Sequence, residues 1–312
     1  MLHLPLLRIT GGGKPYRSLD VVTLPDVRTG EPAVEVSQAN PGVISHDLLR
    51  LGEARRQLEG FSVAELVAIC KRAGKSLGEE ELPVGESGEA QSPERYLEQL
   101  ASTTGMPLSL GRRNLGKIRW VLENMEAVLG GLTRGLDLSV LDVGLPGAGL
   151  LRGSAGTSGA PRLGYQPQSD GLGAVLPGNS PGVHSLWLPA IALKIPLILK
   201  PGREEPWTPY RITQALIAAG CPPAALGFYP TDHAGSGQIL LRCGRSLLFG
   251  DGATVRPWKA DKRVEIHGPG WSKIILGRDQ AANWQPHLEL LATSIAENGG
   301  RSCINASGVW LA

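Results

Sequence analysis

One cysteine stands out in the sequence because a glycine-rich turn comes directly before it. Cys303 follows the letters NGGRS, so its backbone N–H and its thiol are both free of a regular element. A thiol in such a position suits a nucleophile, because the thiolate adds readily to carbonyl carbon. The alternative is that Cys303 is a small core residue, which is the commoner fate of a free cysteine.

Two further polar residues flank the segment that organises the middle of the chain. Residues 173–201 read as strand, turn, helix and strand, with apolar runs at 174–176 and 195–199. Two buried strands joined by a helix require a parallel sheet, and ligands bind at the carboxyl ends of such strands. Asn179 and Lys200 fall at those ends, so we expect both to face one crevice. The alternative is that Asn179 caps a turn and Lys200 is a solvated strand end.

The same alternation continues and predicts an α/β fold. Further strands are expected at 226–229 and 246–249, and helices at 209–219, with Thr208 as its cap, and at 236–243. This order is typical of a doubly wound, Rossmann-like domain. Helices are expected before it, one of them begun by a capping box of Ser62 and Glu65. No GxGxxG follows the first strand, so a dinucleotide would have to be held in another way.

Composition narrows the classes of function. The chain has 312 residues, a net charge of +2 and 42% hydrophobic residues, which favours neither a nucleic-acid partner nor a membrane surface. Its four scattered cysteines indicate neither disulfides nor a zinc site, and the start does not read as a signal peptide. We therefore expect a cytoplasmic protein without a metal. Asp232 and His233 are interpreted as a turn rather than as metal ligands.

Four motifs taken together resemble the NAD(P)-dependent aldehyde dehydrogenase superfamily. They are PGNSP with Asn179, LILKPGREEPWTP with Lys200, VEIHG with Glu265 and NGGRSC with Cys303. They are similar to the family's P-W-N-x-P, K-P-x-E-x-x-P-x-T, E-L-G-G and G-x-x-C. The resemblance covers residues from about 165 onwards well and the helical N-terminal part loosely.

The resemblance implies a role for each motif residue. Cys303 would attack an aldehyde, Asn179 and the Cys303 N–H would stabilise the oxyanion, and Glu265 would activate the water that hydrolyses the thioester. Lys200 would contact the adenosine ribose of NAD or NADP. The remaining residues implied in cofactor binding are Pro177, Gly178, Arg203, Gly250 and Gly252.

The sequence departs from the family pattern at several of these positions. Gly178 replaces a tryptophan, and His267 and Pro269 replace the Gly and Lys of E-L-G-G-K. Arg203 stands where many members carry the Glu that binds both ribose hydroxyls, so a cation could meet the 2′-phosphate of NADP. FGDGATV only approximates the family's F-T-G-S-T around Gly250 and Gly252.

The expected domain organisation follows from the resemblance. Residues 1–263 would form the cofactor-binding domain, with 136–171 as a flexible arm that matches the family's oligomerisation hairpin. Residues 264–312 would begin the catalytic domain, which in the family continues well beyond the cysteine. We therefore expect a C-terminally truncated chain with an exposed apolar face around 304–310, little activity on its own, and a homo-oligomer for the full-length protein.

Two other functions stay open at this stage. The first is an acylating reductase that uses the same cysteine but transfers the acyl group to or from a thiol such as CoA, so that its substrate is an acyl thioester. The second is a nucleotide-binding fragment in which Cys303 and Glu265 perform no chemistry. CoA in place of water as the acyl acceptor would identify the first alternative. Faster alkylation of Cys303 than of Cys70, Cys221 or Cys243 would argue against the second.

Overall fold

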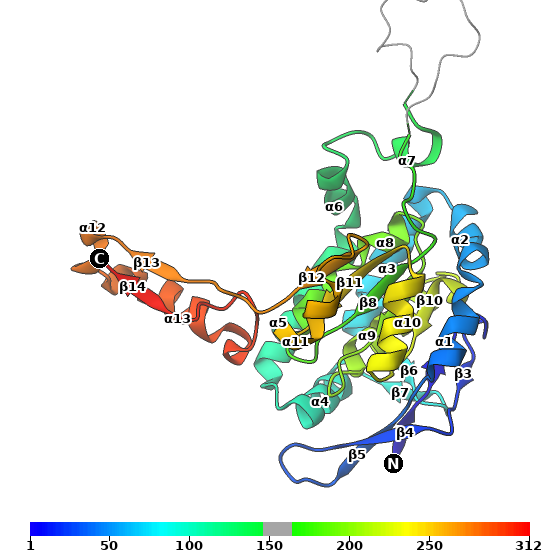
Figure 1. Ribbon diagram of the computed structural model, residues 1–312, viewed down its shortest axis with the longest axis horizontal. Helices are drawn as coiled ribbons and strands as arrows, with labels where there is room; N and C mark the ends of the chain where they lie inside the picture. Colours follow the sequence, from blue (N-terminus) through cyan, green and yellow to red (C-terminus); the bar gives the residue numbers. More distant parts are fainter. Residues whose placement is uncertain (146–163) are drawn as a thin grey trace, which may run out of the picture.

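The computed structural model describes residues 1–145 and 164–312. Residues 146–163 of the arm expected at 136–171 lie outside the described residues, and the arm's first part contains a short helix, α7 (Val140–Val143). Figure 1 shows a layered α/β body from which the last part of the chain projects.

A seven-stranded sheet forms the centre of the body, in the order β12-β11-β8-β9-β10-β2-β3. The first five strands of this order are parallel, and β2 and β3 continue the sheet in antiparallel fashion. The bounds are β8 (Leu172–Val175), β9 (Leu197–Lys200), β10 (Leu226–Phe228), β11 (Arg245–Phe249), β12 (Val264–His267), β2 (Leu6–Leu7) and β3 (Pro15–Tyr16). The chain winds outward from β8 in both directions, so the doubly wound prediction is confirmed.

The connections between the parallel strands are helical, with small departures from the prediction. They are the 3-10 helix η2 (Pro181–Leu186), α8 (Pro189–Ala192), α9 (Trp207–Ala218), α10 (His233–Arg242) and α11 (Gly252–Val255). Thr208 does not cap α9, because the helix begins two residues earlier and the side chain of Glu205 accepts the Thr208 N–H at 2.8 Å. Asp232 caps α10 by accepting from Gly235, as the turn interpretation requires.

Helices from the first half of the chain cover the sheet. They are α1 (Pro41–Leu48), α2 (Leu51–Glu59), α3 (Val63–Glu79), α4 (Pro93–Thr104), α5 (Leu108–Glu123) and α6 (Met125–Leu132). The capping box of Ser62 and Glu65 is present at the start of α3. A hairpin of β6 (Leu82–Val84) and β7 (Glu89–Gln91) follows α3. Buried apolar side chains of α3, α5 and α9 make one continuous core with the sheet.

A smaller sheet at the N-terminus has the order β1-β5-β4. Its strands are β1 (Leu2–Leu4), β4 (Val21–Pro25) and β5 (Pro32–Ser37). The alternation of apolar and polar residues at 33–36 predicts an edge strand, but β5 pairs with both neighbours and lies in the middle. Alternation of apolar and polar residues indicates that one face of a strand is buried, but it does not indicate how many strands pair with it.

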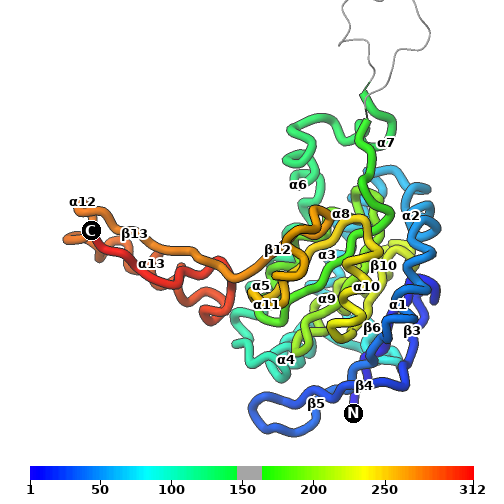
Figure 2. Tube along the Cα trace, viewed as in Figure 1, coloured from blue at the N-terminus to red at the C-terminus, as the bar shows by residue number. Residues whose placement is uncertain are grey.

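The last part of the chain leaves the body after β12. Residues 268–312, called the C-terminal extension below, contain β13 (Ile274–Leu276), α12 (Arg278–Ala281), η5 (Gln285–His287), α13 (Leu288–Ala296), η6 (Glu297–Gly300) and β14 (Val309–Leu311). In Figures 1 and 2 this extension projects away from the central sheet. Residues 264–267, which we expected to open the second domain, are instead the edge strand of the seven-stranded sheet.

Apolar side chains of the C-terminal extension are exposed, as expected for 304–310. Ile304 is 75% exposed and Trp310 is 63% exposed, and β13 and β14 pair only with each other among the described strands. Exposed apolar surface of this kind is typical of a face that another element covers.

Candidate functional site

The point at which the strand order reverses lies between β8 and β11, and a cavity of about 580 Å³ opens there. Ligands of open α/β sheets bind at such a point, outside the carboxyl ends of the strands. The loops after both strands line this cavity, together with the end of β12 and the turn around Cys303. The lining residues that matter below are Pro177, Gly178, Asn179, Phe249, Gly250, Asp251, His267, Arg301 and Cys303.

The cavity therefore brings Asn179 and Cys303 together, although they are far apart in the sequence. Pro177, Gly178 and Gly250 line it as well, whereas Lys200, Arg203 and Gly252 do not. Glu265 is also outside its lining, and the Glu265 side chain is 69% exposed. The expectation that Asn179 and Cys303 share one site thus agrees with the cavity lining, whereas Glu265 lies outside it.

Cys303 differs from the other three cysteines in its surroundings. It is exposed, whereas Cys70, Cys221 and Cys243 are buried. Burial raises the pKa of Cys70 and of Cys243 to about 12 and raises the pKa of Cys221 as well. Because the thiolate is the reactive form, the three buried thiols are inert at neutral pH, and Cys303 is the accessible thiol of the four.

Three consecutive residues with positive φ shape the turn that presents Cys303. Asn298, Gly299 and Gly300 have φ values of 54°, 70° and 72°. Glycine adopts this left-handed region without strain, and asparagine is among the side chains that tolerate it. The letters NGG therefore reverse the chain just before the cysteine. The turn is closed by Asn305, whose side chain accepts the Ser302 N–H at 2.8 Å.

A buried amide pair attaches this turn to the body. The Asn114 side chain on α5 donates to Asn298 at 2.7 Å, and Asn298 donates in turn to the Ser180 hydroxyl at 3.3 Å. Outside this pair, Glu297 accepts from Arg113 and Lys117. Sequence reasoning missed these residues, because α5 is identified from its apolar stripe and its polar side chains carry no motif.

The Asn179 side chain connects the loop after β8 to the cysteine turn. Its Nδ2 donates to the carbonyl oxygen of Arg301 at 2.5 Å. An amide nitrogen carries two hydrogens, so one remains for a ligand in the cavity. The backbone N–H of Cys303 donates no hydrogen bond within the part of the chain that the structure describes. Two donors thus remain beside the thiol.

Glycine backbones allow the close approaches on which the cavity depends. A Cβ on Gly270 would lie 1.5 Å from the carbonyl oxygen of Cys303, so the chain after β12 touches the cysteine turn directly. A Cβ on Gly202 would lie 2.5 Å from the Gly178 backbone. The loops after β8 and β9 therefore pack backbone against backbone, which requires glycine at position 202.

A buried polar network supports the loop that follows Asn179. His184 in η2 accepts the indole N–H of Trp187 at its Nδ1, at 3.2 Å, so its Nε2 carries the hydrogen that faces Glu205 at 3.1 Å. Glu205 also accepts from the backbone and hydroxyl of Thr208. A carboxylate at the start of α9 is favoured by the helix dipole.

Two ionisable side chains near the carboxyl ends of the strands have lowered pKa values. Burial lowers the pKa of Lys200, while the nearby carboxylates Glu204 and Asp232 act in the opposite direction. Asp251 accepts from the backbone and side chain of Thr254, which lowers the pKa of that carboxyl. The N-terminus of the short helix α11 is thus satisfied by the chain's own carboxylate.

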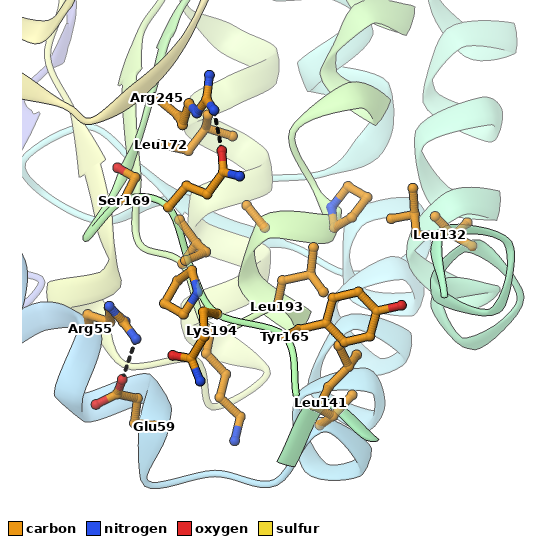
Figure 3. A pocket seen from close by; sticks show the side chains of 18 of the residues that line it. Arg55, Glu59, Leu132, Leu141, Tyr165, Ser169, Leu172, Leu193, Lys194 and Arg245 are labelled. Atoms are coloured by element: carbon orange, nitrogen blue, oxygen red, sulfur yellow. Dashed lines mark hydrogen bonds and ion pairs between the residues drawn. The ribbon is translucent and has the colours of Figure 1, made fainter. Parts of the chain in front are cut away.

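A second, larger cavity of about 800 Å³ lies at the amino ends of the parallel strands (Figure 3). Leu172 and Arg245, which begin β8 and β11, line it, and Figure 3 shows Tyr165 and Lys194 on its other side. The amino ends of parallel strands are not where α/β sheets place ligands. We therefore assign the site to the smaller cavity, which holds the cysteine.

Comparison with known proteins identifies the architecture. No protein-family model matches the sequence, and no curated protein matches it. Among solved structures, a putative aldehyde dehydrogenase from Burkholderia cenocepacia superposes with a TM-score of 0.75 at 19% identity. The chain has the aldehyde dehydrogenase fold.

Two further dehydrogenases have the same fold. Succinate-semialdehyde dehydrogenase from Burkholderia pseudomallei superposes with a TM-score of 0.75 at 17% identity, and an indole-3-acetaldehyde dehydrogenase in complex with NAD⁺ with 0.72 at 18%. In these three comparisons 99–100% of the chain is covered but only 59–60% of the other structure. The chain thus spans about three fifths of the length of these enzymes.

Two findings on the described residues concern membranes and metal ions. No described helix is long and apolar enough to cross a bilayer. Within 1–145 and 164–312, no group of three or more His, Cys, Asp or Glu side chains is placed to hold a metal ion.

Proposed function

We propose that this chain carries the cofactor-binding part and the catalytic cysteine of an aldehyde dehydrogenase, which oxidises an aldehyde to an acid with NAD or NADP. The observation that supports the proposal most is that Cys303 and Asn179 line one cavity at the switch point of an aldehyde dehydrogenase fold. Neither the cysteine nor the fold alone would identify a reaction.

The chemistry of the proposal begins at Cys303. Its sulfur adds to the aldehyde carbon, and the carbonyl oxygen becomes an oxyanion. The second hydrogen of the Asn179 amide and the free Cys303 N–H are the donors available to that oxyanion. One such donor contributes about 3 kcal/mol to stabilisation of the transition state. The Asn179 contact with Arg301 holds the amide in place before the substrate arrives.

The cavity would hold the nicotinamide half of the cofactor, and residues outside the cavity would hold the adenosine half. The backbones of Gly202 and Gly178 lie in close contact beside the cavity, whereas the Asp251 carboxylate occupies the N-terminus of α11. When bound, the cofactor would accept a hydride and leave an acyl thioester on the cysteine. Lys200 and Arg203, outside the cavity, would contact the adenosine half.

Arg203 makes the choice between the two cofactors testable. It is exposed at the carboxyl end of β9, where a guanidinium can pair with a 2′-phosphate. We expect NADP to bind at least tenfold more tightly than NAD in calorimetric titrations, and Arg203→Ala to abolish that preference. Arg242→Ala, an exposed arginine on α10, is the matched control. A preference for NAD in the native chain would contradict the assignment of Arg203.

The cysteine assignment is tested by thiol alkylation followed by mass spectrometry. At pH 8, iodoacetamide should modify Cys303 at least tenfold faster than the three buried cysteines. A small aldehyde should slow the modification of Cys303 alone, because the thiohemiacetal occupies its sulfur. Asn179→Ala should weaken this protection. If aldehydes leave the alkylation of Cys303 unchanged, the proposed function is wrong, and a non-catalytic nucleotide-binding role becomes the better account.

A further inference from the structure

His267 is the ionisable side chain that the sequence motifs left without a role. It occupies a position where the resembled family carries glycine, and it lines the same cavity as Cys303 and Asn179. Glu265, two residues earlier on β12, lies on the same face of the strand, because side chains alternate along a strand. The carboxylate expected to activate water thus lies outside the cavity lining, while an imidazole lies within it.

The imidazole of His267 is held in a defined orientation from two sides. Its ring stacks on Phe249 of the neighbouring strand, with centroids 4.4 Å apart and planes inclined by 12°. The two residues are register partners in the β11–β12 pairing, so the stack is built into the sheet. On the other side, Nε2 lies 3.0 Å from a carboxylate oxygen of Glu265.

A carboxylate lies beside the imidazole but outside hydrogen-bond geometry. A neutral imidazole carries hydrogen on one nitrogen and a lone pair on the other. Nε2 is buried and makes no hydrogen bond, although a Glu265 oxygen lies 3.0 Å from it. This contact becomes an ion pair when the ring takes up a proton, so Glu265 would stabilise the imidazolium that forms when His267 acts as a base.

We propose that His267, positioned by Glu265, is the base that activates water to hydrolyse the acyl thioester on Cys303. The inference rests on the proposed function, because it needs Cys303 as the acylated group. Water oxygen bonds to the acyl carbon, and the unprotonated ring nitrogen of His267 takes its proton. The carbon–sulfur bond then breaks, and the sulfur receives the proton from His267. The products are a carboxylic acid and a free thiol, so water and not a second thiol is the acceptor.

The test uses p-nitrophenyl acetate, an acyl donor that requires no cofactor. Attack by Cys303 releases p-nitrophenolate in a rapid burst, and the steady rate that follows reports hydrolysis of the acetyl-cysteine. His267→Gln should keep the burst but slow the steady phase at least tenfold, with acetylated protein accumulating in intact mass spectra. His46→Gln, an exposed histidine on α1, is the matched control and should leave both phases unchanged.

Two further variants separate a chemical role from a structural one. Added imidazole should restore part of the steady rate to His267→Ala, because a free base can enter the vacated space. Glu265→Ala should slow the steady phase, Glu265→Asp should recover part of it, and neither should change the burst. Glu265 is then a positioning residue.

The outcomes distinguish this inference from the proposed function. A burst followed by unchanged hydrolysis in His267→Gln would overturn the inference alone. Loss of the burst in folded His267→Gln, checked by circular dichroism, would also overturn it, because His267 would then act before the thioester forms. Absence of the burst in the native chain, with Cys303→Ser behaving identically, would overturn the proposed function and this inference with it.

Discussion

The Asn179 side chain donates to the carbonyl oxygen of Arg301 at 2.5 Å, and this hydrogen bond joins the loop after β8 to the turn that carries Cys303. It holds the Asn179 amide at the cavity that Cys303 lines and leaves the second amide hydrogen free.

Replacing Asn179 by Ala should therefore slow acylation of Cys303 by about 100-fold, the effect of losing one oxyanion donor. The burst rate with p-nitrophenyl acetate measures it. Asn283→Ala, at an exposed position after α12, is the control and should keep the native rate. An equal burst rate in Asn179→Ala would show that the amide does not contact the oxyanion.

Asn298 should determine how firmly the C-terminal extension is attached. Asn298→Ala removes the hydrogen bonds to Asn114 and Ser180 and puts at a φ of 54° an alanine, which tolerates the left-handed region less well than asparagine. Hydrogen exchange should rise in residues 297–303 and not in the central sheet. Asn298→Gly, which loses the bonds but not the backbone fit, should show a smaller increase. Equal exchange in both variants would contradict the role given to the left-handed conformation.

The buried pair of His184 and Glu205 should be important for stability. The side chain of Glu205 is 1% exposed and that of His184 is fully buried. Glu205→Ala leaves the Thr208 N–H and the histidine without their partner, which should cost about 3–5 kcal/mol of unfolding free energy. Urea denaturation measures it. Glu204→Ala, an exposed neighbour, should change the unfolding free energy by less than about 0.5 kcal/mol.

The buried carboxylate of Asp47 should make the free energy of unfolding depend on pH. Its carboxylate is fully buried, which raises its pKa, but hydrogen bonds from Arg8, Tyr229 and Thr10 outweigh burial and lower the pKa overall. A carboxyl whose pKa is lowered by folding stabilises the protein above its unfolded pKa of about 4, and this stabilisation is lost as the pH falls below that value. Asp47→Asn should be less stable than the native chain at pH 7 and lose less stability on acidification. Urea midpoints from pH 7 to pH 3 test this, with exposed Asp20→Asn as the control. Parallel curves for native and Asp47→Asn protein would refute the assignment.

Position 202 should tolerate no side chain, because its backbone lies against that of Gly178. In Gly202→Ala the new Cβ would approach the Gly178 backbone to 2.5 Å, so one of the two loops must move. We expect weaker NAD(P) binding together with a lower unfolding midpoint. Gly237→Ala on α10 has open space around its Cβ and should instead stabilise the helix by about 0.5–1 kcal/mol. Unchanged cofactor affinity in Gly202→Ala would remove this loop contact from the cofactor site.

Much of the parallel sheet could be predicted from the sequence, because short apolar runs between Gly- and Pro-rich turns have few alternatives to buried strands. The strands ending near Leu199, Tyr229 and Phe249 lie within a residue or two of their predicted ends. The capping box of Ser62 and Glu65 was predictable for the same reason, since it depends on residues three apart. Such features are local, and the sequence contains all the groups that make them.

The site is different, because its geometry depends on contacts between distant segments. The motifs named Cys303 and Asn179, but only the folded chain shows them on one cavity, attached through Asn114 and Asn298. Strand pairing also placed His267 opposite Phe249 at the cavity, whereas Glu265 lies outside the cavity lining. The register of β12 on β11 sets which side chains face the ligand, and a register is fixed by pairing across the sheet rather than by the letters of one strand.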